Sequence, residues 1–242
     1  MSADVWDDIG DAAGERLRSE LIDMVKNAAS NSGRSKQTEP GPSQIGDPCT
    51  YCLASRILGV YDRGPFDDPW LMVIGTAVHK WLETAAKKDN KNGGAWCTET
   101  KVWPDDELLP KGGSCDLYQD NTGTVIDHKI SSQEMIRKYK VSGPGLTYRR
   151  QAHLYGLGFA NANLPVNRVA IAFWQRGGRT TDLYVWSEPY DENIARETLE
   201  RYKTLRDLCA AGGEAILASL PSDPDCFNCS RNPRAESQPI PA

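Results

Sequence analysis

The pattern of apolar and polar positions predicts helices and strands following one another along the chain. Apolar residues recur at spacings of three and four in 71–87 and in 191–211, which predicts an amphipathic helix in each segment. Residues 168–176 are almost continuously apolar, as in a strand buried on both faces, and 180–188 alternate as its hairpin partner. Residues 95–104 alternate as a further strand. The inward side of the last helix is predicted to carry Ile194, Leu199, Tyr202, Leu205 and Leu208.

Two short strands around a polar turn form the centre of this pattern, in residues 112–130. Because side chains alternate across a strand, Asp127 and Lys129 should point to one face and His128 to the other. If the hairpin pairs, Asp116 on its first strand comes close to the same place. Two carboxylates and a lysine would then meet, which suffices to bind a divalent metal and stabilise a phosphoryl transition state. The alternative is a solvated strand face.

Two predicted helices carry further candidate side chains. In the first, His79 and Glu83 lie one turn apart, on a face shared with Gly75, so the carboxylate could orient the imidazole or share a metal with it. A second helix, beginning near Gly145, places Gln151 and Tyr155 one turn apart. The alternatives are a structural histidine and ordinary helix packing.

Four of the seven cysteines form two C-x-x-C pairs, Cys49 with Cys52 and Cys226 with Cys229. Each pair lets two thiolates reach one centre, and two pairs complete a tetrahedral four-sulfur site. Because 173 residues (53 through 225) separate the pairs, a metal there would join the two ends of the domain and close a very long loop. The alternative is four unrelated buried cysteines. Three further cysteines lack a partner at ligand spacing and are expected in the core: Cys97, Cys115 and Cys209.

Composition fits a globular protein of 242 residues, with 25% charged and 39% apolar residues. No apolar run reaches the ~18 residues that a bilayer span needs, and the acidic beginning of the chain is the reverse of a signal peptide. We therefore expect a cytoplasmic protein with no membrane partner. In a reducing compartment, the cysteines favour metal binding or redox work over disulfides.

Charge is distributed unevenly. The net charge of −5 argues against a broad nucleic-acid surface, but residues 129–150 carry six basic side chains and one acid, Glu134. Such a window could follow a phosphate backbone, and the alternative is an ordinary solvated face. The basic residues are Lys129, Arg137, Lys138, Lys140, Arg149 and Arg150.

The N-terminal segment is predicted to be separate from the domain. An amphipathic helix with Leu17, Leu21, Met24 and Val25 lies within the first 30 residues and is expected to pack on the domain or on a partner. Residues 31–43 have the composition of a linker. The predicted organisation is an N-terminal helix and linker in 1–41, one domain in 42–232, and a flexible tail in 233–242.

Taken in order, these motifs resemble the PD-(D/E)XK nuclease superfamily, in particular its RecB-type branch, which includes phage and CRISPR-adaptation exonucleases. The resemblance covers roughly residues 42–230. The matching segments are GTAVHKWLE (75–83), GGSCD (112–116), VIDHK (125–129) and QAHLY (151–155). The opening segment PSQIGDPCTYCLASRILG (42–59) resembles the first-cysteine segment of the iron–sulfur members of that branch.

Two departures from the family pattern stand out. The proline of the superfamily name is absent, since Cys115 precedes Asp116, although Gly113 to Asp116 matches the Gly-x-x-Asp of RecB-type members. The cysteines divide two and two, whereas iron–sulfur relatives often have one N-terminal and three C-terminal. We expect a [4Fe–4S] cluster, with structural Zn²⁺ as the alternative, because paired C-x-x-C knuckles also suit zinc.

The resemblance implies a restriction-endonuclease-like α/β fold: a mixed central sheet flanked by helices, with the N- and C-terminal segments joined by the four-cysteine site. It also implies a metal-dependent DNA exonuclease for recombination, repair or end processing, acting on linear single- or double-stranded DNA. A recombinase, helicase or other end-processing protein would be its partner, and the protein could be phage-encoded and act in the host cytoplasm. Alternatives are a structure-specific endonuclease of the same fold and a non-catalytic DNA-end-binding protein.

The resemblance also implies roles for individual residues. Asp116, Asp127 and a main-chain carbonyl beside Asp127, that of His128, would hold Mg²⁺ or Mn²⁺, with His79 as a further ligand. Lys129 would orient the attacking water or stabilise the transition state. Gln151 and Tyr155 would position the substrate strand. Glu83 would support the metal ligands from behind. Tyr139 and Tyr148 would stack on unpaired bases.

Overall fold

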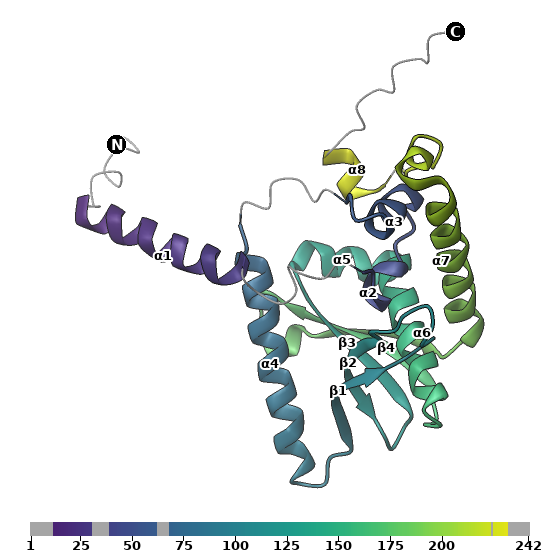
Figure 1. Cartoon of the computed structure of the whole chain (residues 1–242). Helices are drawn as coiled ribbons and strands as arrows, with labels where there is room; N and C mark the ends of the chain where they lie inside the picture. The colour runs from purple at the N-terminus through teal and green to yellow at the C-terminus, as the bar shows by residue number, and fades with distance from the viewer. Residues whose placement is uncertain (1–11, 31–38, 62–67, 224, 232–242) are drawn as a thin grey trace.

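The computed structural model describes residues 12–30, 39–61, 68–223 and 225–231, and within them a five-stranded sheet lies between helices (Figure 1). The predicted tail at 233–242 and most of the predicted linker lie outside the described residues. The strands follow the order of the sequence across the sheet. They are β1 (Trp96–Val102), β2 (Gly113–Gln119), β3 (Thr124–Ser131), β4 (Arg168–Gln175) and β5 (Tyr184–Pro189).

The sheet is mixed, as the sequence predicts. β1, β2 and β3 form an antiparallel meander, β4 pairs in parallel with β3 over eight residues, and β5 returns antiparallel to β4. A parallel neighbour requires a long crossover, and two helices supply it: α5 (Gln133–Ser142) and α6 (Leu146–Asn161). The sequence pattern did not predict α5. Ser132 is its N-cap residue, whose hydroxyl accepts a hydrogen bond from the N–H of Met135, and Ile136 is its one buried residue.

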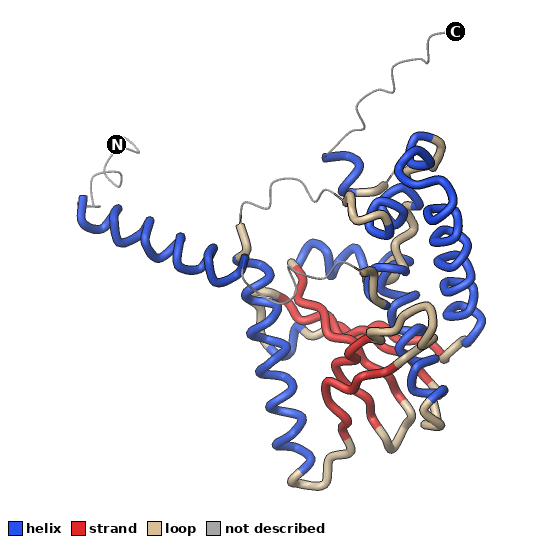
Figure 2. The backbone as a smooth tube through the Cα atoms, in the orientation of Figure 1, coloured by secondary structure: helices blue, strands red, loops and turns tan. Residues whose placement is uncertain are grey.

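Helices cover both sides of the sheet (Figure 2). On one side, α4 (Trp70–Asn90) packs on β1, β2 and β3. On the other side, α6 packs on β3 and β4, and α7 (Glu192–Gly212) packs on α6 from outside. Because α6 lies between two layers, every residue from 151 to 159 is buried. Both α4 and α6 therefore deliver side chains to the same sheet from opposite sides.

The inward side of α7 was predicted correctly except at one position. Leu199, Tyr202 and Leu205 are buried and Ile194 is half-buried, but Leu208 is 51% exposed. Cys209, one residue further on, is buried in its place, because positions 202, 205 and 209 keep the helical spacing of three and four.

The remaining elements lie toward the two ends of the chain. Helix α1 (Ala12–Ser30) extends away from the sheet with Leu17, Leu21 and Met24 exposed, so the predicted helix is present but does not bury its apolar stripe within the described residues (Figure 1). No described helix is long and apolar enough to cross a membrane. Short elements complete the fold: α2 (Pro42–Ile45), α3 (Thr50–Ile57), η3 (Thr180–Asp182), η4 (Gly213–Ala218) and α8 (Phe227–Arg231).

Candidate functional site

The candidate site lies where β2 and β3 separate. The two strands pair from Leu117↔Ile126 to Gln119↔Thr124, whereas β3 stays paired with β4 as far as Ser131. At the point of separation, the backbone N–H of His128 donates a hydrogen bond of 2.7 Å to Oδ2 of Asp116. The Asp116 carboxylate thus accepts a hydrogen bond that a main-chain carbonyl of β2 would accept if the two strands stayed paired.

The side-chain alternation of β2 is interrupted at the same point. Cys115 and Tyr118 lie in the same core cluster although they are three residues apart, whereas a regular strand would place them on opposite faces. The pairs Thr98↔Leu117 and Thr100↔Cys115 place Glu99 opposite Asp116, and Glu99 has a φ of 48°. The interruption accompanies a contact between Asp116 and α4, where Nδ1 of His79 lies 3.1 Å from Asp116 Oδ1.

Asp127 is the buried centre of a second set of contacts. Nζ of Lys129 lies 2.6 Å from Oδ2 of Asp127, and Nε2 of Gln151 donates to Oδ1 at 2.9 Å. The same Gln151 nitrogen lies 3.2 Å from the hydroxyl of Tyr155. Burial raises the pKa of the Asp127 carboxyl, against the opposing effect of Lys129. Asp127, Lys129, Gln151 and Tyr155 therefore form one contact set.

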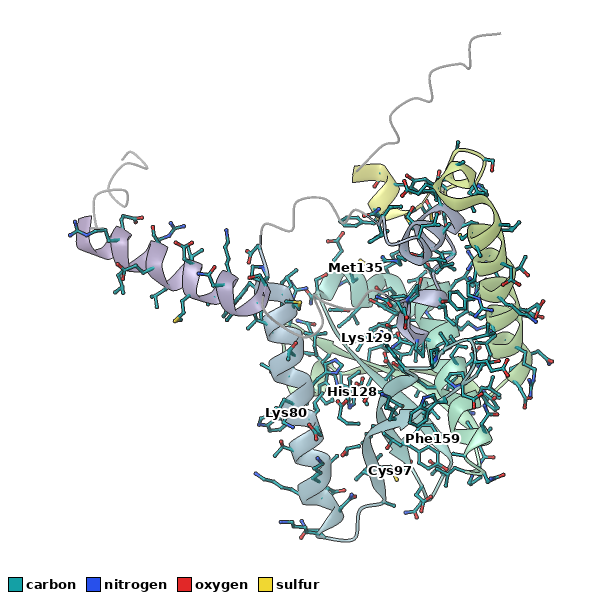
Figure 3. The ribbon with its side chains drawn as sticks, viewed as in Figure 1. Lys80, Cys97, His128, Lys129, Met135 and Phe159 are labelled. Carbon is teal, nitrogen blue, oxygen red and sulfur yellow. The ribbon has the colours of Figure 1, made fainter. Side chains whose placement is uncertain are left out.

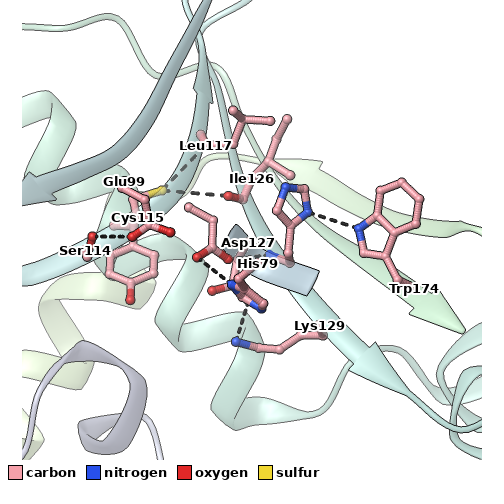
Figure 4. A network of polar contacts seen from close by, with 12 residues as sticks. His79, Glu99, Ser114, Cys115, Leu117, Ile126, Asp127, Lys129 and Trp174 are labelled. Atoms are coloured by element: carbon pink, nitrogen blue, oxygen red, sulfur yellow. Dashed lines mark hydrogen bonds and ion pairs between the residues drawn. The ribbon is translucent and has the colours of Figure 1, made fainter. Parts of the chain in front are cut away.

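His128 points to the other face, as the alternation predicts. Nε1 of Trp174 donates a hydrogen bond of 3.3 Å to its Nδ1 (Figure 4). Burial lowers the pKa of His128 to about 4, so its imidazole is neutral near pH 7. Its ring meets that of His79 edge-on, with the centroids 6.1 Å apart. The side chain is therefore engaged with Trp174, and the predicted contribution of His128 to a metal rests on its main-chain carbonyl.

His79 and Asp116 favour each other's charged forms. The hydrogen bond to Asp116 raises the pKa of His79, against the effect of burial. Burial raises the pKa of Asp116, but the hydrogen bonds from His79 and from the N–H of His128 outweigh it, and the net shift is downward. The Asp116 carboxylate thus favours a positive charge beside it, whether that charge is a proton on His79 or a metal cation.

Gly113 allows the α6 side chains to reach the site. A Cβ atom at this position would lie 2.7 Å from the ring of Pro42 and 2.8 Å from the ring of Tyr155. Only glycine fits this close approach. This gives the first glycine of the Gly-x-x-Asp segment a packing role beside Tyr155.

Some of the predicted site residues are engaged elsewhere. Glu83 does not orient His79 in this structure, because its two oxygens bind the ammonium groups of Lys80 and Lys87 at 2.7 and 2.5 Å. Tyr139 and Tyr148 are half-buried around Phe173, with the Tyr139 ring stacked on it at 4.5 Å. Their predicted availability for base stacking is thereby reduced.

The basic window divides into a paired and an exposed part. Nε of Arg149 lies 2.5 Å from Oε1 of Glu188, and Arg150 donates to the carbonyl of Gly46. Lys129 pairs with Asp127. The exposed basic side chains of the window lie on α5: Arg137, Lys138 and Lys140.

Glu99 is a candidate that sequence reasoning missed. The ligand atoms of His79, Glu99 and Asp116 all lie within 4.8 Å of one another, the one such group with a histidine among the described residues. Its one hydrogen bond described here comes from Ser114 Oγ, at 2.9 Å from Oε2 (Figure 4). Glu99 could have been found only from the pairing register of β1 with β2, which places it opposite Asp116. The ten-residue connection between these strands leaves that register unspecified in the sequence.

The four paired cysteines converge as predicted. Cys49 and Cys52 are buried at the start of α3, and Cys226 and Cys229 approach them at α8. The Sγ–Sγ distances are 3.7 Å for Cys49 to Cys229 and 3.5 Å for Cys52 to each of Cys226 and Cys229. The Asp223 N–H and the Asn228 amide reach toward these sulfurs. Four sulfurs with polar donors around them have the chemistry of a metal site.

The three unpaired cysteines do not behave alike. Cys115 and Cys209 are buried, as predicted. Cys97 is exposed on β1, so its prediction as a core residue is wrong (Figure 3). β1 is the edge strand, and Cys97 falls on an outward position of its alternating burial pattern.

Comparison with known proteins identifies structural relatives. No protein-family model and no curated protein sequence matches the chain. An alkaline exonuclease, LHK-Exo from Laribacter hongkongensis, aligns with a TM-score of 0.51 and 13% identity over 77% of this chain and 95% of its own. Its complex with dAMP aligns with a TM-score of 0.50 and 14% identity over 76% and 94%. A phage-related exonuclease from Haemophilus somnus 129PT aligns with a TM-score of 0.45 and 16% identity over 72% and 95%. The chain therefore has the mixed α/β fold of the alkaline exonuclease. In this chain, the fold brings the two cysteine pairs together.

Proposed function

We propose that the protein is a metal-dependent DNA exonuclease. The observation that carries this proposal lies at the separation of β2 and β3. There, Asp116 accepts a hydrogen bond from the N–H of His128, the residue between Asp127 and Lys129, and Lys129 and Gln151 both contact the carboxylate of Asp127. The fold of an alkaline exonuclease over 77% of the chain supports the same conclusion, as does the dAMP bound in one structure of that relative. Recombination, repair or end processing, with a helicase or recombinase as partner, is the setting we propose for this activity.

The donor set suits a divalent cation. Carboxylates from Asp116 and Asp127, the carbonyl of His128 and the imidazole of His79 would hold Mg²⁺ or Mn²⁺, and an imidazole favours Mn²⁺ more than an all-oxygen site would. Such a cation lowers the pKa of bound water and neutralises charge on a phosphate.

The chain's own residues account for the remaining requirements. Lys129 holds an ammonium 2.6 Å from Asp127, where it can stabilise negative charge on a scissile phosphate. Gln151 fixes the carboxylate of Asp127 from the opposite side and is itself buried, so it acts as a positioning residue. The exposed basic residues of α5 give the DNA backbone a positive surface close to the end of β3.

We also propose that the four cysteines bind one structural Zn²⁺, in preference to the [4Fe–4S] cluster that the resemblance implies. A tetrahedron with metal–sulfur distances of about 2.3 Å has sulfur–sulfur edges of about 3.8 Å. The Sγ–Sγ distances of 3.5–3.7 Å match it. A cluster places each thiolate on a different iron, which requires a wider separation of the sulfurs.

Cleavage of end-labelled linear DNA beside covalently closed circles tests the nuclease proposal, with Mn²⁺ or Mg²⁺ and with EDTA as a control. We expect metal-dependent loss of linear DNA alone. Cutting of the circles would make the protein an endonuclease, and intact DNA retained by the protein would make it a non-catalytic binder.

Variants at the site assign the residues. We expect Asp127→Asn and Lys129→Ala to abolish cleavage while the circular dichroism spectrum stays that of the wild type. The exposed residues Asp120 and Lys203 provide matched controls, since Asp120→Asn and Lys203→Ala make the same changes at the surface. Undiminished cleavage by either site variant would remove our assignment of that residue.

A further inference from the structure

We propose that Glu99, together with His79 and Asp116, binds a divalent cation at a position of its own beside Asp127. This inference rests on the proposed nuclease function and deepens it: Asp116 would serve both positions, and His79 would bind at the Glu99 position when both are occupied. The edge strand β1 would thereby contribute to the site a ligand that none of the motifs in the sequence contains.

The first support is the convergence of three elements on one point. His79 comes from α4, Glu99 from β1 and Asp116 from β2, and their ligand atoms lie within 4.8 Å of one another. Three equally spaced donors, each about 2.0–2.2 Å from one cation, lie at most about 3.5–3.8 Å apart. Closing the set onto a cation therefore requires each donor to move by less than about 1 Å. Asp127 does not belong to this group, which makes the position distinct.

The second support is the backbone of Glu99. A non-glycine residue with a φ of 48° inside a strand is strained and persists only where its surroundings impose that conformation. The pairing continues in register on both sides, so the unusual conformation is confined to the residue opposite Asp116. Ser114 holds one carboxylate oxygen from the neighbouring strand. The strand therefore presents a fixed carboxylate at this point.

The third support is the local charge. Glu99 and Asp116 bring two carboxylates together, and the cationic side chains nearby are committed to other acids, Lys80 to Glu83 and Lys129 to Asp127. His79 is the remaining partner of Asp116. One nitrogen and two carboxylate oxygens form a donor set suited to Mn²⁺ or another transition-metal ion.

Manganese binding to the full chain, followed by electron paramagnetic resonance and calorimetry without DNA, tests this proposal. Loss of a charged ligand should weaken Mn²⁺ binding at this position at least about tenfold, since even supporting residues behind a ligand contribute about 10–100-fold. We expect this loss in Glu99→Gln and not in the matched control Glu107→Gln, an exposed glutamate after the same strand. Asp127→Asn should retain binding at the Glu99 position.

The outcomes separate this inference from the nuclease proposal. Wild-type Mn²⁺ affinity in Glu99→Gln, with the same melting temperature as the wild type in EDTA, would overturn the inference whether or not the protein cleaves DNA. Weakened binding in Glu99→Gln would sustain it even if the wild type cleaved no DNA. Loss of all Mn²⁺ binding in Asp127→Asn would also overturn it, because the Glu99 position would then not be separate.

Discussion

Replacing Cys226 by serine removes one thiolate from the site that joins the two ends of the domain. Cys226 and Cys229 lie at α8, and they contact cysteines at the start of α3 across 173 intervening residues. The cysteine sulfurs of the two segments lie 3.5–3.7 Å apart, so a metal bound between them would link α8 to α3. We expect Cys226→Ser to weaken metal binding and to lower the stability of the whole domain.

The length of the closed loop sets the magnitude. In the chain-entropy treatment of a cross-link, a loop of this length stabilises the folded state by about 5 kcal/mol. For a chain of about 150–250 residues, each kcal/mol corresponds to roughly 2–4 °C in melting temperature. Complete loss of the metal link should therefore lower the melting temperature by roughly 10–20 °C.

Thermal unfolding and metal analysis of the purified variants measure this effect. Wild type should be colourless and contain one zinc ion per chain, and Cys226→Ser should contain less. Cys97→Ser serves as the matched control, because it makes the same substitution at an exposed cysteine outside the cluster. Wild-type melting and metal content in Cys226→Ser would refute the metal link. A brown protein absorbing near 400 nm would refute zinc and restore the iron–sulfur cluster.

Two further predictions concern packing and pH. Gly113→Ala should destabilise the domain by about 1–3 kcal/mol in chemical denaturation, because its Cβ would overlap the Tyr155 ring. The control Gly75→Ala should not, because a Cβ there meets nothing within 4 Å. Equal stability of the two variants would contradict the close approach at Gly113. Burial raises the pKa of Glu188, but hydrogen bonds from its arginine and histidine partners outweigh it and leave the pKa lowered. The charged Glu188 carboxylate therefore adds stability above its unfolded-state pKa, and this stability is lost as the pH falls through its folded-state pKa. The wild type should accordingly lose more stability than Glu188→Gln between about pH 5 and pH 3. Parallel profiles of stability against pH would contradict this.

Local patterns were sufficient for most of the fold. Strands β1 and β5 alternate with a period of two, β4 is a nearly continuous apolar run, and α4 and α7 have a period of three to four. Each of these elements was predicted from that pattern. Helix α5 was missed because it buries one residue, Ile136, and so has almost no apolar stripe. Its charged residues suggested a binding surface in place of a helix.

The candidate site was predictable only where its parts are local in sequence. Asp127 and Lys129 share a face through alternation alone, and Gln151 and Tyr155 share one through the helical turn. Glu99 depends on the pairing of β1 with β2 and on a backbone conformation that interrupts the alternation, neither of which a single sequence specifies. The contact of Trp174 with His128 depends in the same way on the parallel pairing of β3 with β4.

The division of the cysteines between the two ends of the chain also orders events during synthesis. Cys49 and Cys52 leave the ribosome before any strand of the sheet, and Cys226 and Cys229 leave after the last one. Four thiolates can therefore enclose a metal only when every strand and α7 have already been made. Capture of the proposed ion would then be the closing step of assembly. A chain interrupted before α8 would carry the candidate site residues without the proposed link between its ends.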